Sequence, residues 1–90
     1  MRVVVTPQFT KSIKKFHANQ KADIDKAVKA VLKNPSIGVQ KVRDLSWFRI
    51  HKFRMVSQLA LLAYEIDGTD RIVLHNLGSH ENFYRDLKAR

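Results

Sequence analysis

His80 and Tyr84 place a titratable imidazole and a phenol close together near the end of the chain. If a helix follows Gly78, their spacing of four residues puts both side chains on one face of it. Ser79 suits the N-cap of that helix, because its hydroxyl can accept a hydrogen bond from a free backbone N–H of the first turn. The reference pKa of histidine, about 6.5, suits either role in proton transfer near neutral pH. We therefore treat His80, with Tyr84 beside it, as the first candidate for chemistry.

A second group of candidates lies in residues 47–54, where apolar and cationic side chains alternate. In an extended chain, Phe48 and Ile50 point to one side and Arg49 and His51 point to the other. The pattern therefore predicts a strand with one cationic face. A guanidinium group on such a face can bind two oxygens of one phosphate.

The elements that position these residues follow from the spacing of apolar side chains. Residues 2–5 form a β-branched run that is typical of a strand. Residues 7–16 carry one apolar stripe at helical spacing, after a cap residue and a proline. A break at residues 17–20 precedes a second helix over residues 21–33, which ends before Pro35 because the residue preceding a proline disfavours the α region. We expect the two helices to form an antiparallel hairpin.

The second half of the chain predicts three further strands. Residues 47–54 form one, and residues 59–66, which are apolar on both faces, form a central one. Residues 39–45 leave room for a short strand. Asp67-Gly68 predicts a hairpin, and residues 71–77 form the last strand before the C-terminal helix. The order β-α-α-β-β-β-α predicts an α+β fold, with a helical hairpin packed on a small, mainly antiparallel four-stranded sheet and a C-terminal helix. The first strand should run parallel to an edge strand or a central strand.

The chain of 90 residues carries a formal net charge of +9. Such a charge implies a polyanionic partner, namely nucleic acid, an acidic membrane surface or an acidic protein, unless it only keeps the surface soluble. The chain has no cysteine, which excludes disulfides and cysteine-based zinc sites. No apolar run reaches the roughly 20 residues of a membrane span. We expect no secretion signal, because the apolar region near the N-terminus is too short for one. We expect one soluble, cytoplasmic domain over residues 1–90, with no membrane partner.

The order of elements resembles the RelE/ParE superfamily of bacterial toxins from toxin–antitoxin pairs, over essentially the whole chain. The most specific match is Leu77-Gly-Ser-His-Glu-Asn-Phe-Tyr84, which is similar to the Gly-Thr-His segment of YafQ-type members. The segment Phe48-Arg-Ile-His-Lys52 resembles the strand that carries catalytic lysines in RelE-like members. In the segment Leu61-Leu-Ala-Tyr64, which is similar to an Arg-Leu-Val-Tyr segment of those members, Leu61 departs from the arginine.

This resemblance implies a toxin that acts as a metal-independent endoribonuclease. It would cleave translated messenger RNA at the ribosome, and a cognate antitoxin protein would hold it inactive. The superfamily also implies two alternatives, namely a ParE-like inhibitor that binds DNA gyrase and a RelE-like toxin weakened by the change at Leu61. Cleaved transcripts would distinguish the nuclease from a gyrase inhibitor, which would cause a DNA-damage response. No cofactor is expected in any of these cases.

Cleavage of RNA needs a base, an acid and cations around the phosphate, because the 2′-OH attacks the adjacent phosphorus and the 5′-oxygen leaves. By the resemblance, His80 is the proton-transfer residue, and Tyr84 orients phosphate or stacks on a base. The further catalytic candidates are His51 and Arg49. The expected phosphate-binding residues are Arg54, Lys52, Lys41 and Arg43.

Each candidate also has a purely structural interpretation. A histidine at the start of a helix is often only a polar residue near the cap, and His51 on a strand face is often only solvated. His75 lies within an apolar run, so we expect it in the core or at a sheet edge. Lys11, Lys14 and Lys15 are typical of a solvated helix face. No metal site is expected, since zinc motifs and paired carboxylates at helical ligand spacing are absent from the sequence.

Overall fold

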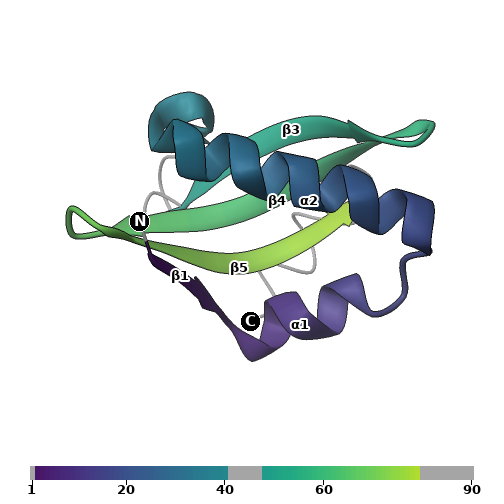
Figure 1. Ribbon diagram of the computed structural model, residues 1–90, viewed down its shortest axis with the longest axis horizontal. Coiled ribbons are helices and arrows are strands. Elements are labelled where there is room, and N and C mark those ends of the chain that lie inside the picture. The colour runs from purple at the N-terminus through teal and green to yellow at the C-terminus, as the bar shows by residue number, and fades with distance from the viewer. Residues whose placement is uncertain (1, 41–47, 80–90) are drawn as a thin grey trace.

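The computed structural model describes residues 2–40 and 48–79, which form a five-stranded sheet with two α-helices on one of its faces (Figure 1). The strands are β1 (Arg2–Val5), β2 (Val39–Gln40), β3 (Arg49–Met55), β4 (Gln58–Asp67) and β5 (Arg71–Ser79). The helices are α1 (Pro7–Ile13), α2 (Ala18–Lys33) and the short 3-10 helix η1 (Pro35–Ile37). The predicted α+β class is therefore confirmed.

The strands follow the order β1-β5-β4-β3-β2 across the sheet. Strand β1 runs parallel to β5 at one edge, and the remaining pairs are antiparallel. The prediction of four strands was wrong by one, because Val39 and Gln40 pair with Ile50 and Arg49 as a second edge strand. A two-residue strand is too short to show an alternating pattern in the sequence.

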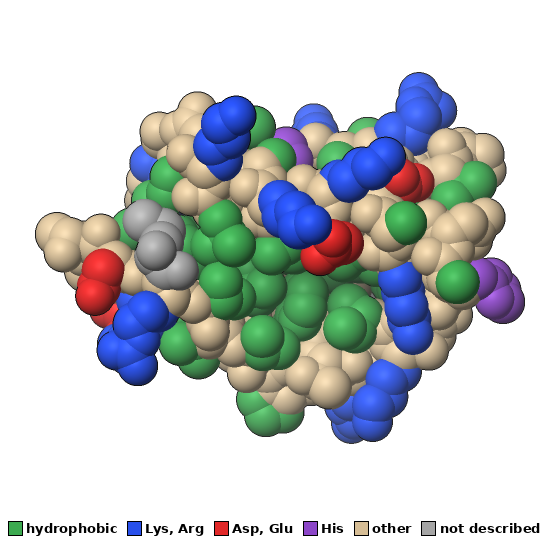
Figure 2. Space-filling model, viewed as in Figure 1, with side chains coloured by type: hydrophobic (Ala, Val, Ile, Leu, Met, Phe, Trp, Pro, Cys, Tyr) green, Lys and Arg blue, Asp and Glu red, His purple; other side chains and the backbone are tan. Residues whose placement is uncertain are grey.

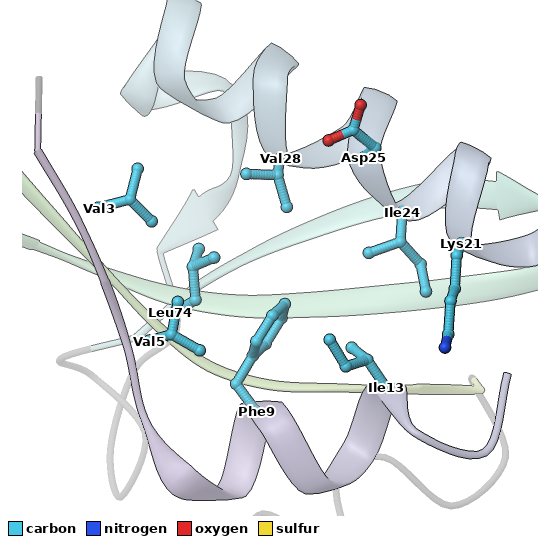
Figure 3. Close-up of a pocket in the computed structure, with 9 residues that line it drawn as sticks. All are labelled: Val3, Val5, Phe9, Ile13, Lys21, Ile24, Asp25, Val28 and Leu74. Atoms are coloured by element: carbon cyan, nitrogen blue, oxygen red, sulfur yellow. The ribbon is translucent and has the colours of Figure 1, made fainter.

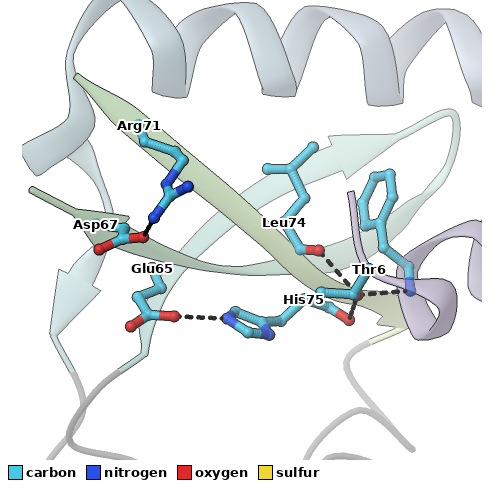
Figure 4. Close-up of polar contacts among 7 residues, drawn as sticks. Thr6, Glu65, Asp67, Arg71, Leu74 and His75 are labelled. Atoms are coloured by element: carbon cyan, nitrogen blue, oxygen red, sulfur yellow. Dashed lines mark hydrogen bonds and ion pairs between the residues drawn. The ribbon is translucent and has the colours of Figure 1, made fainter. Parts of the chain in front are cut away.

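Thr6 fixes the start of α1 and joins it to the sheet. Its Oγ1 accepts a hydrogen bond from the backbone N–H of Phe9 at 3.2 Å, as expected of a threonine at an N-cap. The same oxygen lies 3.0 Å from the carbonyl oxygen of Leu74 and 3.1 Å from that of His75, both on β5 (Figure 4). Pro7 follows at the first helical position, as predicted. The turn between β1 and α1 is thereby held against the strand beside β1.

Helix α2 begins at Ala18, earlier than the predicted start at Lys21. The side chain of Gln20 closes this end, because its Oε1 accepts the backbone N–H of His17 at 2.8 Å. Residues 17–20, which were predicted as a break, are therefore the cap and first turn of the helix. The other end agrees with the prediction, since α2 stops at Lys33.

The main core lies between the sheet and the two helices. Its buried side chains are Phe9, Ile24, Val31, Met55, Ala60, Leu62, Tyr64, Ile72, Leu74 and Leu77. A smaller buried cluster consists of Phe48, Ile50, Leu61 and Ala63. Because successive side chains of a strand alternate, this cluster lies on the opposite face of the sheet. Strand β4 thus has buried residues on both faces, as predicted for a central strand.

Strands β4 and β5 form the hairpin predicted from Asp67-Gly68, and Gly68 adopts a positive φ of 72° in its turn. Strand β5 continues past the predicted end at Leu77, because Gly78 and Ser79 still pair with β4. The predicted C-terminal helix falls on residues 80–90, which lie outside the described residues.

Candidate functional site

Half of the predicted site residues lie in the described part of the chain, and all of these are on β3. They are Arg49, His51, Lys52 and Arg54. The other predictions, His80, Tyr84, Lys41 and Arg43, lie outside the described residues. The candidate site is therefore built here from β3 and the strands that pair with it.

The pleat of β3 divides its cations between the two faces of the sheet. Met55 lies in the main core under the helices, and Ile50 lies in the smaller cluster on the opposite face. Because neighbouring side chains alternate along a strand, Arg49 lies on the side of Met55 and Arg54 lies on the side of Ile50. The structure thus does not bring these two guanidinium groups together. We call the side turned away from the helices the helix-distal face, and its residues include Ile50, Lys52, Arg54, Leu61 and Ala63.

On the helix side, Arg49 belongs to a hydrogen-bonded network that holds the segment after α2. Its Nη1 donates to the carbonyl oxygen of Gly38 at 2.8 Å. The hydroxyl of Tyr64, the cross-strand partner of Arg49, accepts the Gly38 N–H at 2.9 Å and donates to the carbonyl of Pro35 at 2.5 Å. Burial raises the pKa of Tyr64, although the Gly38 N–H and the charge of Arg49 act in the opposite direction. In this structure Arg49 anchors residues 35–38 to β3 and β4.

His51 is partly buried on the same side of the sheet as Arg49. Its ring stacks on that of Phe53, with 6.0 Å between the ring centroids and 16° between the planes. Burial lowers the pKa of His51, because desolvation disfavours the charged imidazolium. A neutral imidazole can exchange protons near pH 7, but this one lies on the opposite face from Lys52 and Arg54.

The helix-distal face carries the exposed cations Lys52 and Arg54. Lys52 pairs with Leu61 of β4, and Leu61 pairs in turn with Gly78 of β5, so the three residues form one row across the sheet. Since neighbouring strands lie about 4.8 Å apart, the backbones of Lys52 and Gly78 are separated by roughly 10 Å. In the sequence, Gly78 stands two residues before His80. The described row nearest to His80 along the chain is that of Phe53, Ala60 and Ser79, and the row of Lys52 lies next to it.

Leu61 occupies the centre of that row and is fully buried. It packs in one cluster with Phe48, Ile50 and Ala63, which confirms the predicted pairing of Phe48 with Ile50 on one face. The centre of the helix-distal face is therefore apolar. Among the described residues of β3 and β4, the cations on this face are Lys52 and Arg54, and both belong to β3.

His75 is buried, as predicted for a histidine within an apolar run. Its Nε2 lies 3.0 Å from Oε1 of Glu65 (Figure 4). The ring of His75 meets that of Phe48 edge-on, with 4.9 Å between the centroids. Glu65 was not among the predicted residues. The hairpin register around Asp67-Gly68 is the signal that could have indicated it, because that register brings β4 and β5 side by side.

An apolar pocket of about 320 Å³, which the sequence did not predict, lies between α1, α2 and β1 (Figure 3). Its lining includes Val3, Val5, Phe9, Ile13, Ile24 and Val28, together with the charged residues Lys21 and Asp25. Figure 2 shows the pocket as an apolar hollow with Lys and Arg side chains around it. Strand β1 is exposed along its whole length and pairs only with β5 in the described sheet, so the pocket lies beside a free sheet edge.

Within residues 2–40 and 48–79, no three His, Asp or Glu side chains gather as metal ligands. In the same part of the chain, no helix combines the length and the apolar character that crossing a membrane requires.

Comparison with known proteins relates both the sequence and the fold to bacterial toxins. A family model described as the ParE-like toxin of type II bacterial toxin–antitoxin systems matches residues 3–88. A mutant of the E. coli toxin RelE in the free state has a TM-score of 0.71 at 20% identity, covering 98% of this chain and 95% of that chain. A chain of the intact E. coli RelBE toxin–antitoxin complex has a TM-score of 0.69 at 21% identity, covering 89% and 96%. The RelE mutant in complex with an antitoxin RelBc peptide has a TM-score of 0.68 at 20% identity, covering 99% and 93%. Curated protein sequences contain no match to this chain.

Proposed function

This chain belongs to the ParE-like toxins of type II bacterial toxin–antitoxin systems, within the RelE/ParE superfamily, and we propose that it is a toxin that cleaves translated messenger RNA. The observation that carries the proposal is the pair of exposed cations, Lys52 and Arg54, on the helix-distal face. They stand across β4 from the end of β5, and the chain reaches His80 directly after that end. A proton-transfer residue beside cations is what RNA cleavage requires, whereas binding alone does not require it.

In the proposed reaction, the RNA supplies its own nucleophile. The 2′-oxygen forms a bond to the adjacent phosphorus, and the bond from phosphorus to the 5′-oxygen breaks. A base takes the proton from the 2′-OH, and His80 gives a proton to the leaving 5′-oxygen. Lys52 and Arg54 stabilise the charge that develops on the phosphoryl oxygens, while Tyr84 orients the phosphate or stacks on a base. The products are a 2′,3′-cyclic phosphate and a 5′-hydroxyl.

The geometry changes the roles of two predicted catalytic residues. Arg49 already donates to the Gly38 carbonyl, and His51 is partly buried against Phe53 on the helix side. We therefore assign phosphate binding to Lys52 and Arg54 and keep His80 as the acid. Lys41 and Arg43 remain proposed phosphate ligands.

Transcript mapping after induced expression tests this proposal. Proton transfer by a positioned side chain contributes roughly 10²–10⁴-fold to a rate, so His80→Ala should nearly abolish cleavage. Lys52→Ala/Arg54→Ala should also protect transcripts, whereas Arg71→Ala, which removes an exposed cation from the β4–β5 hairpin, should not. Toxicity with an intact transcript pool would sink the nuclease proposal.

The second candidate function is inhibition of DNA gyrase by binding, and a specific observation favours it. Fully buried Leu61 stands where the superfamily's RNases carry an arginine, so the middle of the helix-distal face is apolar. A buried leucine cannot bind a phosphate, so this change removes a cation that RNA cleavage would use and that binding alone does not require. A DNA-damage response with uncut RNA, and loss of gyrase supercoiling in the presence of the purified protein, would support this candidate.

We further propose that a cognate antitoxin binds in the apolar pocket beside β1. The related RelE structures include complexes with antitoxin RelB chains, and the pocket is lined mainly by apolar side chains next to a free strand edge. The net charge of +9 favours an acidic segment, which can be disordered alone and fold on binding. Val3→Lys/Val5→Lys should weaken neutralisation by the product of the neighbouring reading frame. Val39→Lys, at the opposite sheet edge, is the matched control and should leave neutralisation unchanged.

A further inference from the structure

The end of the β3–β4 hairpin carries an exposed leucine beside two exposed cations. Leu59 keeps 44% of its surface exposed, although the five residues that follow it on β4 are all fully buried. Side chains alternate along a strand, so Leu59 lies on the helix-distal face, two residues before Leu61. Arg54 stands directly opposite Leu59 on β3, and Lys52 pairs with Leu61 in the next row of this face. The Cβ atoms of directly opposite residues lie about 5 Å apart, so Leu59 borders the proposed phosphate site.

The charges that the hairpin itself places around Leu59 are all positive. Residues 48–64 contain two arginines and one lysine but neither aspartate nor glutamate. From α2, Asp23 reaches this end of the hairpin, and its carboxylate accepts the backbone N–H of Val56. An apolar side chain among cations matches a ligand that carries apolar faces on an anionic chain. Single-stranded nucleic acid has this character, because its bases are flat and its phosphates are charged.

The turn beside Leu59 is held in one conformation. Val56 has a φ of 60°, a strained value for a β-branched residue, and the carboxylate of Asp23 holds its N–H at 2.8 Å. Met55 and Gln58 close the turn as a strand pair, and Met55 is fully buried. Strain of this kind persists where surrounding contacts hold the backbone in place. The fold thus presents Leu59 from a fixed support, which a side chain needs if it is to displace part of a ligand.

The proposed reaction requires a conformation of the RNA that cations alone do not produce. The 2′-oxygen attacks when it lies in line with the bond from phosphorus to the 5′-oxygen. Stacking of neighbouring bases holds an RNA strand in a helical form in which these atoms are out of line. Apolar side chains, leucine among them, can insert between the base steps of nucleic acids and unstack them. An apolar residue beside the phosphate ligands can therefore open the strand at the bond that breaks.

We infer that Leu59 inserts between the two bases that flank the phosphate held by Lys52 and Arg54, and that it unstacks them. The inference rests on the proposed ribonuclease function and adds a positioning residue to it, since no proton passes through a leucine. Aliphatic carbon meets the flat faces of the bases, so the contact does not require a particular base. Purine steps, which stack most strongly, should depend on Leu59 most.

The fluorescence of 2-aminopurine tests this inference, because stacking quenches it and unstacking restores it. The probe is a single-stranded RNA oligonucleotide with one 2-aminopurine among adenines. The protein is the full chain with His80→Ala, so that the RNA stays intact. Binding should raise the fluorescence several-fold. Adding Leu59→Ala should abolish this rise, whereas Leu59→Met, which keeps an apolar side chain of similar volume, should retain it.

Controls separate this role of Leu59 from a loss of charge or of apolar surface in general. Ile66→Ala truncates another exposed apolar side chain of β4, near its other end, and should keep the rise. Leu59→Ala should leave the slope of log K against log salt unchanged, whereas Arg54→Gln should reduce it by about 0.7, the value for one phosphate contact of a single strand. In cells, Leu59→Ala should slow transcript cleavage by about tenfold or more, because the RNA must then unstack without help.

Several results would overturn the inference. An equal rise with and without Leu59→Ala would mean that Leu59 only covers the aliphatic stem of Arg54. Binding of the RNA by the His80→Ala protein without any rise, or no binding at low salt, would also overturn it. Loss of affinity for anionic phospholipid vesicles in Leu59→Ala, with RNA unstacking unchanged, would indicate a membrane contact instead. The ribonuclease proposal fails by a separate result, namely intact transcripts in cells that express the unchanged protein.

Discussion

Arg49 and Arg54 lie on the same strand, β3, but on opposite faces of the sheet. Arg49 turns toward the helices and donates to the carbonyl of Gly38, whereas Arg54 is exposed on the helix-distal face. A strand reverses its side chains at every residue, and an odd number of steps separates the two arginines. One guanidinium therefore stabilises the fold, and the other is free to meet a ligand.

Substitution of these arginines should separate stability from activity. Arg49→Ala leaves the Gly38 carbonyl without its side-chain donor and should lower the free energy of unfolding by about 1–3 kcal/mol. Arg54→Ala should change stability by no more than about 0.5 kcal/mol, as is usual for surface positions. It should nevertheless weaken RNA binding and toxicity. Urea unfolding and RNA anisotropy on both variants check this, and a stable Arg49→Ala protein with weakened RNA binding would contradict it.

Tyr64→Phe should destabilise the protein although it removes only one oxygen. The hydroxyl satisfies both the Pro35 carbonyl and the Gly38 N–H, and the ring is fully buried. Leaving buried polar groups unpaired costs about 1–3 kcal/mol. Because Arg49 acts on the same glycine, Tyr64→Phe/Arg49→Ala should lose less stability than the sum of the single losses. Strict additivity in urea unfolding would show that the two residues do not share a network.

Asp23 and Asp25 lie on the same helix, α2, but differ in their contacts, so substitution of each tests what its contact contributes to stability. Asp23 accepts the N–H of Val56 at 2.8 Å, and Val56 has a φ of 60°, a conformation that β-branched residues rarely adopt. Asp23→Ala should therefore lower the free energy of unfolding by about 1 kcal/mol, because the β3–β4 turn loses this hydrogen bond. Asp25 pairs with Lys29, with both side chains mostly exposed, so Asp25→Ala should stay within about 0.5 kcal/mol. Thermal unfolding measures both, and equal losses would refute the role of the turn.

The lowered pKa of His51 should make the stability of the protein depend on pH. Burial lowers this pKa in the folded state, so the unfolded chain takes up the proton at a higher pH than the folded chain does. The stability should therefore fall as the pH drops below about 6.5, the reference pKa of histidine. His51→Gln should flatten this part of the curve, and His17→Gln, which removes an exposed imidazole, serves as the control. Denaturant midpoints between pH 5 and pH 8, together with the NMR titration of the His51 ring, measure the effect. A stability that rises on acidification through this range would contradict it.

Features that depend on residues close together in the sequence were predicted correctly, whereas features that depend on contacts between distant segments were not. The hairpin at Asp67-Gly68 and the central strand 59–66 were predicted correctly, because turn chemistry and apolar patterns act over a few residues. A short strand within residues 39–45 was allowed but was not counted among the four predicted strands, because β2 depends on a partner strand rather than on its own two residues. The alternation of residues 48–51 was also confirmed, but the face that the helices cover could not be read from β3 alone.

Composition and short-range spacing were sufficient for the α+β class and the cationic character, since both depend on neighbouring residues or on simple counts. The resemblance to the toxin superfamily came from the order of elements and from short matching segments, and the family match over residues 3–88 confirmed it. The separate roles of Arg49 and Arg54, the network of Tyr64 with Pro35 and the pocket beside β1 became visible in the assembled fold. Their physical reason is the same in each case. The contacts join segments far apart in the chain, such as Tyr64 and Pro35 at a separation of 29 residues, and they form when the strand order brings those segments together.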